Sequence, residues 1–128
     1  MSVETVLHYL PESENQMAGL VLFQNEAFHI TLGLTWLHGT HQVVVQKAER
    51  NGEAVQKVIL ANASLPRNFN GRIELMAESK NAQLAFYYKT GKGKWQLLLD
   101  GFDATYLSTE TAQGFIGTIL ALYASSNE

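Results

Sequence analysis

Histidine is the first side chain to consider for chemistry, and of the four in the chain only His38 and His41 lie close together. Two imidazoles at this spacing could bind zinc, but a zinc site needs further ligands and hydrogen bonds that orient them. Both residues flank a predicted hairpin turn, where polar side chains are expected in any case. The pattern therefore favours solvated loop histidines, and we assign no metal-binding residue.

The chain contains only two aspartates, Asp100 and Asp103, on either side of Gly101-Phe102. Inverting glycoside hydrolysis needs two carboxyl groups across a sugar, typically roughly 6.5–9.5 Å apart. Aspartates at turns more commonly accept hydrogen bonds from their own backbone. We therefore expect Asp100-Gly101 to end a strand in a turn. No cofactor is predicted, although calcium could bind here because hard cations take carboxylate oxygens.

Thr90-Gly91-Lys92-Gly93-Lys94 combines glycine and lysine, as phosphate-binding loops do. It lacks the G-x-x-x-x-G-K-[ST] spacing, and it precedes a strand where a phosphate loop would precede a helix. A hairpin turn is the better interpretation. The chain also has no cysteine and no serine in a G-x-S-x-G motif, so nucleophilic catalysis has no candidate residue. We assign no catalytic residue.

Aromatic side chains remain, because an exposed ring on a β-sandwich can stack on a sugar. Tyr87 is placed opposite Phe86 by the alternation of its strand and has polar neighbours. Trp36 and Trp95 are the two tryptophans of the chain. Tyr87, Trp36 and Trp95 are therefore candidates for sugar stacking, with packing in the core as the alternative for each.

The elements that would position these residues are β-strands. Residues 29–36 alternate apolar and polar side chains, which predicts a half-buried strand. Residues 42–47 follow after His38-Gly39-Thr40, so the two runs form a hairpin. Asn51-Gly52 then predicts a second hairpin into residues 53–60, because Asn-Gly suits the tight turn that joins two strands.

The second half of the chain continues the pattern after a loop at residues 65–71, which is rich in residues that break strands. Further strands are predicted at residues 72–78, 83–89, 95–99 and 115–123. Alternation predicts that one face of the first two carries Ile73, Leu75, Ala77, Leu84, Phe86 and Tyr88. Many short strands joined by compact turns predict an all-β fold, an antiparallel sandwich.

Length and composition limit the class of protein. A chain of 128 residues suits one domain, which we place at residues 1–128, and 46% hydrophobic against 16% charged residues is typical of a globular protein. The net charge of −3 and scattered basic residues indicate no nucleic-acid partner. No apolar run is long enough for a membrane helix, and no secretory signal is seen. The absence of cysteine fits a cytoplasmic location.

Two motifs give the chain a family resemblance: AGLVLFQNEAFHITLGLT at Ala18–Thr35 and LSTETAQGFIGTILALYAS at Leu107–Ser125. They resemble the C-terminal β-sandwich of the β-xylosidases and α-L-arabinofuranosidases of glycoside hydrolase family 43. The segment between them resembles the middle of that domain. Its matching positions are Arg72-Ile73-Glu74, Phe86-Tyr87-Tyr88, Trp95, Asp100-Gly101 and Leu107-Ser108-Thr109.

The resemblance implies a concanavalin A-like jelly roll that serves as an accessory domain. In such enzymes the catalytic carboxylates lie on a separate five-bladed β-propeller, which would be the partner of this domain. The resemblance also implies that Gly114-Phe115-Ile116-Gly117 belongs to a loop that reaches the propeller, so Phe115 would contribute to the rim of the substrate pocket. The alternative is that Phe115 begins the final strand and packs in the core.

The resemblance further implies that the chain lacks the first strands of the full domain. An exposed sheet edge or apolar face would then favour association, so a homo-oligomer is an alternative. We predict no hydrolase activity for the chain by itself. The other functions that the sequence leaves open are a free carbohydrate-binding module for xylan-type sugars, with a xylo-oligosaccharide as ligand, and a structural fragment that dimerises.

Overall fold

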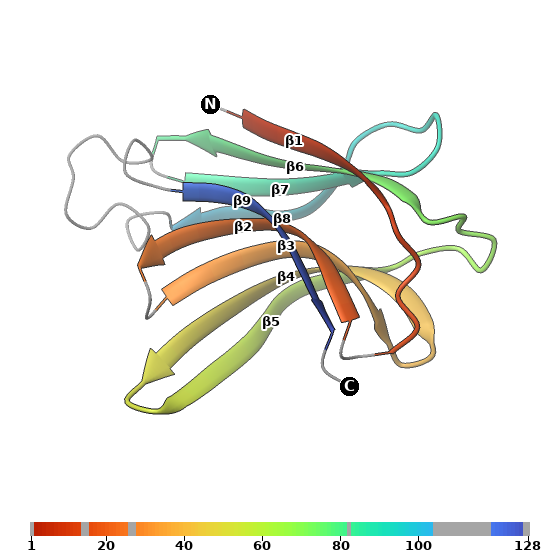
Figure 1. Ribbon diagram of the computed structural model, residues 1–128. Helices are drawn as coiled ribbons and strands as arrows, with labels where there is room; N and C mark the ends of the chain where they lie inside the picture. The colour runs from red at the N-terminus through yellow and green to blue at the C-terminus, as the bar shows by residue number, and fades with distance from the viewer. Residues whose placement is uncertain (1, 14–15, 26–27, 82, 104–118, 127–128) are drawn as a thin grey trace.

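The described part of the chain is an all-β sandwich of two antiparallel sheets (Figure 1). The computed structural model describes residues 2–13, 16–25, 28–81, 83–103 and 119–126. One sheet has the strand order β1-β6-β7-β8, and the other has the order β5-β4-β3-β2-β9. The predicted fold class is confirmed. The strands are β1 (Ser2–His8), β2 (Gln16–Asn25), β3 (Phe28–Leu37), β4 (Thr40–Asn51), β5 (Ala54–Ser64), β6 (Arg72–Lys80), β7 (Gln83–Lys89), β8 (Gln96–Asp103) and β9 (Ile119–Ser126).

Two tight turns form the hairpins of the five-stranded sheet where the sequence predicts them. β3 turns into β4 through His38 and Gly39, whose φ angles are 52° and 77°. Two successive positive φ angles are typical of a type I′ turn, which matches the twist of the two strands. The second turn, from β4 to β5, includes Gly52 with a φ of 68°. Both predicted hairpins are confirmed.

The hydrophobic core lies between the two sheets and is built from alternate residues of their strands. On the four-stranded sheet, Ile73, Leu75 and Phe86 are fully buried, and Leu84 and Ala77 are nearly so. This burial confirms the predicted inward faces of β6 and β7. Each large apolar side chain removed from water contributes roughly 1.5–3 kcal/mol to stability. The five-stranded sheet contributes Leu20, Leu22, Ile30, Leu32, Leu34, Val43 and Val45 to the same core.

The central strand β3 is buried on both faces, so the prediction of a half-buried strand was wrong. On its outward face, Thr31 and Thr35 are each only 2% exposed. Thr31 pairs with Val21 of β2, and the next outward residue of β3, Gly33, pairs with Val44 of β4. Both valines are also buried. The Thr35 hydroxyl donates to the carbonyl oxygen of Gln16 over 2.7 Å, which satisfies its hydrogen-bonding group.

The four-stranded sheet is the layer that positions Tyr87 and Trp95, whereas Trp36 lies at the end of β3 in the other layer. In the residues that the structure describes, no helix is long and apolar enough to cross a membrane.

Candidate functional site

The outward face of the four-stranded sheet carries a row of large side chains. Met76 of β6 is the register partner of Tyr87 of β7, and Tyr87 is in turn the partner of Leu97 of β8. Because Leu75 and Phe86 point into the core, their neighbours in the sequence point away from it. Leu97 is 55% exposed, whereas Met76 and Tyr87 are half-buried. The placement of Tyr87 opposite Phe86 is therefore confirmed.

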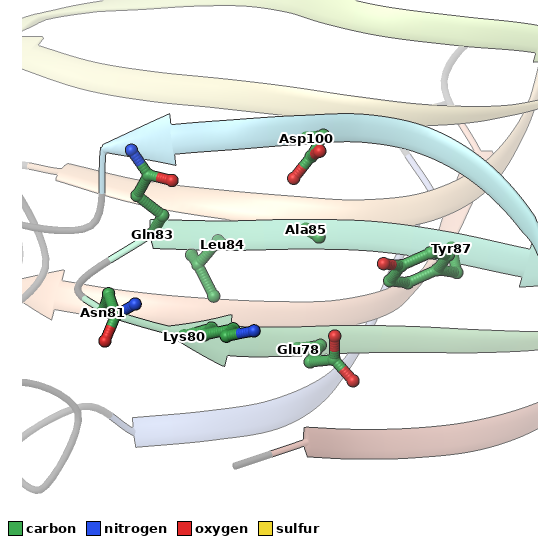
Figure 2. Close-up of a pocket in the computed structure, with 8 residues that line it drawn as sticks. All are labelled: Glu78, Lys80, Asn81, Gln83, Leu84, Ala85, Tyr87 and Asp100. Atoms are coloured by element: carbon green, nitrogen blue, oxygen red, sulfur yellow. The ribbon is translucent and has the colours of Figure 1, made fainter.

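A hollow of about 300 Å³ lies beside Tyr87 on this face (Figure 2). Its floor is Ala85, whose short side chain leaves a depression between longer neighbours. Figure 2 shows Tyr87 at one end with its hydroxyl group toward the hollow, and Glu78 and Asp100 on opposite sides of Ala85. The residues that line the hollow are Glu78, Lys80, Asn81, Gln83, Leu84, Ala85, Tyr87 and Asp100.

An irregularity in β8 brings Asp100 to this hollow. In the β7–β8 ladder, Asp100 and Gly101 together lie opposite Ala85 alone. Gly101 has a φ of 70°, and its N–H donates to Oδ1 of Asp100 over 2.8 Å. An extra residue with a left-handed glycine forms a β-bulge, which redirects the neighbouring side chains. The prediction that Asp100-Gly101 ends the strand was wrong, because the pair forms a bulge inside β8, which continues to Asp103.

The polar groups around the hollow both donate and accept hydrogen bonds. The carboxylates of Glu78 and Asp100 accept, the ammonium group of Lys80 donates, and the amides and the phenol can do both. With the two carboxylates against the single ammonium group, the hollow carries a small net negative charge. Across the described ranges, no group of three or more histidine, aspartate or glutamate side chains could hold a metal ion.

Trp95 lies on the same face of the sheet, on the side of Tyr87 that is away from the hollow. Lys89 lies two residues after Tyr87 on β7, and its Nζ is 5.0 Å from the centroid of the Trp95 ring. The same Nζ is 3.5 Å from Oε2 of Glu74. This cation–π contact holds the Trp95 ring against the protein. Trp95 and Tyr87 therefore share a face of the sheet, but Trp95 does not line the hollow.

Trp36 belongs to a separate site. Its ring meets the ring of His41 edge-on, with 4.8 Å between the centroids, and the His41 ring is 5.7 Å from that of Phe69. Nε2 of His41 also lies 3.0 Å from the carbonyl oxygen of Pro11. The prediction of a solvated loop residue is thus wrong for His41, which packs among rings, and right for exposed His38. The hollow of about 350 Å³ here is lined by Trp36, Gly39, Thr40, His41, Leu65, Pro66 and Arg67.

Comparison with known protein families identifies the fold of this sandwich. The model of the β-xylosidase C-terminal concanavalin A-like domain, from family 43 glycoside hydrolases, matches residues 1–128. The chain belongs to this family. The match confirms the resemblance that the sequence motifs indicated and the concanavalin A-like architecture that it implied.

The relatives of this chain are considerably longer proteins. The xylosidase/arabinosidase of Butyrivibrio fibrisolvens is 32% identical over 124 residues, which cover 94% of this chain and 22% of the relative. The xylan β-1,4-xylosidase of Bacillus halodurans C-125 has a TM-score of 0.74 and 26% identity, over 98% of this chain and 24% of its own. The family 43 protein BlXynB of Bacillus licheniformis has a TM-score of 0.78 and 21% identity, over 99% of this chain and 24% of its own. The chain spans less than a quarter of the length of each.

Phe115, the residue nominated for the pocket rim, lies outside the described residues, so its position stays a prediction. Of the three candidate stacking residues, only Tyr87 lines the hollow of Figure 2. The neighbours that complete the hollow, Glu78, Gln83 and Asp100, were not singled out together by sequence reasoning. The polar residues that alternate with Ile73, Leu75 and Phe86 were the available signal.

Proposed function

We propose that this β-xylosidase C-terminal domain is a non-catalytic accessory part of a family 43 glycoside hydrolase that degrades xylan or xylo-oligosaccharides. In that enzyme it would brace a five-bladed β-propeller that carries the catalytic carboxylates. One observation carries the proposal: the domain family matches the whole chain, while the chain covers only 22% of a xylosidase/arabinosidase. The remainder of such a protein has ample length for a separate catalytic domain.

The arrangement of carboxylates supports a non-catalytic role. Glycoside hydrolysis uses an acid and a second carboxylate on either side of the scissile bond, and the acid depends on a partly dehydrated environment. Glu78 and Asp100 are the carboxylates that face each other across the hollow, and both residues are exposed. A carboxyl group in open solvent is poorly suited to act as the acid of a glycosidase.

The β4–β5 hairpin supports the bracing role. β5 is an edge strand, and Figure 1 shows this hairpin extending away from the other strands of its sheet. Val55, Val58 and Ile59 on β5 are 48%, 42% and 42% exposed. Val55 and Ile59 lie on one face of this strand and Val58 on the other. Branched apolar side chains exposed on an edge strand favour a contact with another protein surface. The remainder of the parent enzyme is the partner that the length of the relatives suggests.

Phe115 is the residue through which the domain would act on the substrate pocket. Its nomination rests on the resemblance of Gly114-Phe115-Ile116-Gly117 to the family loop that reaches the propeller. An apolar ring at the rim can exclude water and narrow a pocket without taking part in proton transfer.

A chimeric enzyme tests the proposal. This chain would replace the matching segment of the Butyrivibrio fibrisolvens xylosidase/arabinosidase, and a version truncated before that segment would serve as reference. We expect the chimera to unfold at a higher temperature than the truncated protein, and Phe115→Ala in the chimera to lower kcat/KM on an aryl β-xyloside about tenfold. Leu97→Ala, which removes an exposed side chain, is the control. A chimera no more stable than the truncated protein would refute the bracing role.

The absence of catalysis is tested on the 128-residue chain itself. We expect no turnover of an aryl β-xyloside above that of a heat-inactivated sample. Turnover that disappears in Glu78→Gln or Asp100→Asn would show that the hollow is an active site and would overturn the non-catalytic role.

A further inference from the structure

We propose that Asn51, at the tip of the β4–β5 hairpin, is a site of spontaneous modification that converts its side-chain amide into a carboxylate. Water is the co-reactant, and the products are aspartate and isoaspartate at position 51. The chain contains two Asn-Gly pairs, Asn51-Gly52 and Asn70-Gly71. The structure favours the reaction at the first pair and hinders it at the second. The inference rests on the geometry of these two turns and does not depend on the accessory role.

The reaction uses the backbone nitrogen of the glycine that follows the asparagine. The nitrogen of Gly52 attacks Cγ of Asn51, which closes a five-membered succinimide ring. The side-chain nitrogen leaves as ammonia, with the proton that the Gly52 nitrogen loses. Water then opens the ring: breaking the bond from this nitrogen to Cγ gives aspartate, and breaking its bond to the main-chain carbonyl carbon gives isoaspartate. Glycine permits the attack best because it has no Cβ atom beside the reacting nitrogen.

The tip of the β4–β5 hairpin leaves Asn51 and Gly52 free to react. Both residues are exposed, and Figure 1 shows the hairpin extending away from the other strands of its sheet. Among the described residues, the side chain of Asn51 has no hydrogen-bond or ion-pair partner. Asn51 pairs with Ala54 at the end of the β4–β5 ladder. Because the ends of strands open readily, the rotation that brings the Gly52 nitrogen to Cγ costs little more than this last pair.

The second pair is held on both sides of the reacting bond. Oδ1 of Asn70 accepts a hydrogen bond from the N–H of Arg72 over 3.0 Å, which fixes the side chain. Gly71 is buried, and its carbonyl oxygen accepts from the N–H of Tyr9 over 2.8 Å. Leu10 also lies against this glycine, since its Cγ would be 3.0 Å from a Cβ atom at Gly71. Ring closure at Asn70 therefore requires both hydrogen bonds to break and buried backbone to move.

The modification would change the charge and the geometry of the hairpin. Both products add one negative charge to a chain whose net charge is −3. The new carboxylate is two residues from Glu49 and from Glu53, so it is placed among like charges. Isoaspartate also lengthens the main chain by one methylene group, because the backbone then runs through Cγ. The extra group lies beside the tight turn, where it disturbs the pairing of Asn51 with Ala54.

Peptide mass spectrometry of the 128-residue chain tests the proposal. The folded chain is incubated at mildly alkaline pH, which assists loss of the Gly52 proton, and samples are digested with trypsin. Cleavage after arginine and lysine places the two sites in separate peptides, residues 51–57 and residues 68–72. We expect the first peptide to acquire the mass change from amide to acid, as two chromatographic peaks, more than about tenfold faster than the second. In urea, which unfolds both turns, the two rates should agree within about threefold.

Two variants provide the controls. Asn51→Gln keeps a side-chain amide but would need a six-membered ring, so the acidic form of the folded chain should not accumulate in ion-exchange chromatography over the same period. Gly52→Ala places a methyl group beside the reacting nitrogen and should slow the reaction about tenfold. Among the described residues, no heavy atom lies within 4 Å of that methyl group. Should the φ of 68° at Gly52 prevent the alanine variant from folding, Asn51→Gln decides alone.

Three results would overturn the proposal. One is a folded chain in which residues 68–72 are modified as fast as residues 51–57. Another is a peptide 51–57 that stays unmodified in the folded chain while it is converted in urea. The third is an acidic form that accumulates to the same extent in folded Asn51→Gln, because the modified residue would then lie elsewhere.

Discussion

Gly19 of β2 has no room for a side chain, so we expect Gly19→Ala to destabilise the sandwich strongly. A Cβ atom at this position would overlap the carbonyl oxygen of Leu32 and lie 2.6 Å from Cα of Gly33. Both obstacles belong to the backbone of β3, which cannot rotate away as a side chain can. β2 is also paired with β9 on its other edge, so it cannot move from β3 without disturbing that second ladder.

The expected cost follows from the size of this overlap. Excess atoms in a well-packed interior typically cost 1–3 kcal/mol, and more where the surroundings cannot adjust. Because the strand is held on both edges, we expect a loss of about 3 kcal/mol. For a domain of this size that corresponds to a fall in Tm of roughly 10–15 °C. Urea and thermal unfolding, followed by circular dichroism, would measure both quantities.

Gly33→Ala is the matched control, because Gly33 is the register partner of Gly19. A Cβ atom at Gly33 would meet Cγ and Sδ of Met17 at 2.9 and 3.0 Å and the carbonyl oxygen of Ala18 at 3.2 Å. The methionine side chain is flexible and can move aside, and the Ala18 carbonyl needs to shift by only a few tenths of an ångström, so we expect a loss below about 1 kcal/mol. A Gly19→Ala variant whose free energy of unfolding lies within about 0.5 kcal/mol of that of the original chain would refute the backbone clash, and so would equal losses of stability in the two variants.

Three further predictions concern the core, a half-buried histidine and the bulge. Phe86→Ala should lower the free energy of unfolding by about 3–5 kcal/mol in urea titrations, since it empties a fully buried site; a loss below about 1 kcal/mol would contradict its central place. Burial, and then the charge of Lys57, lowers the pKa of His29 from its usual 6.5. The unfolded chain therefore binds more protons below about pH 6.5, so stability is full above that pH and falls as the pH is lowered through it. His29→Gln should flatten this dependence in unfolding measured from pH 7.5 to 5, and an unchanged slope would exclude His29 as its source. Gly101→Ala should cost about 1–2 kcal/mol in thermal unfolding, because its φ of 70° is unfavourable for alanine; no loss would mean that the bulge adjusts freely.

Local patterns predicted much of this fold. The alternation of Ile73, Leu75, Leu84 and Phe86 identified the inward faces of two strands, because side chains in a strand alternate between its faces whatever lies across from them. Asn51-Gly52 predicted the β4–β5 turn, since the turn geometry is a property of those residues themselves. The order of the motifs also identified the family, which the match over residues 1–128 confirmed.

The strand β1 and the exact extent of β8 were not predicted. β1 is short, and its alternation gains meaning only from its pairing with β6. The bulge at Asp100 depends on how β8 pairs with β7, and a sequence pattern of aspartate and glycine is equally typical of a turn that ends a strand.

The sequence by itself determined the all-β class, the strand faces and the family, because these depend on composition, on the period of two and on ordered motifs. Only the tertiary structure decided which side chains meet. Tyr87, Glu78 and Asp100 come from three strands, and their meeting depends on the register of two ladders and on two irregularities in the pairing of β7 with β8. The same is true of His41, which packs against Trp36 and Phe69. Register and packing are set by contacts between segments far apart in the chain, and no local pattern of residues specifies them.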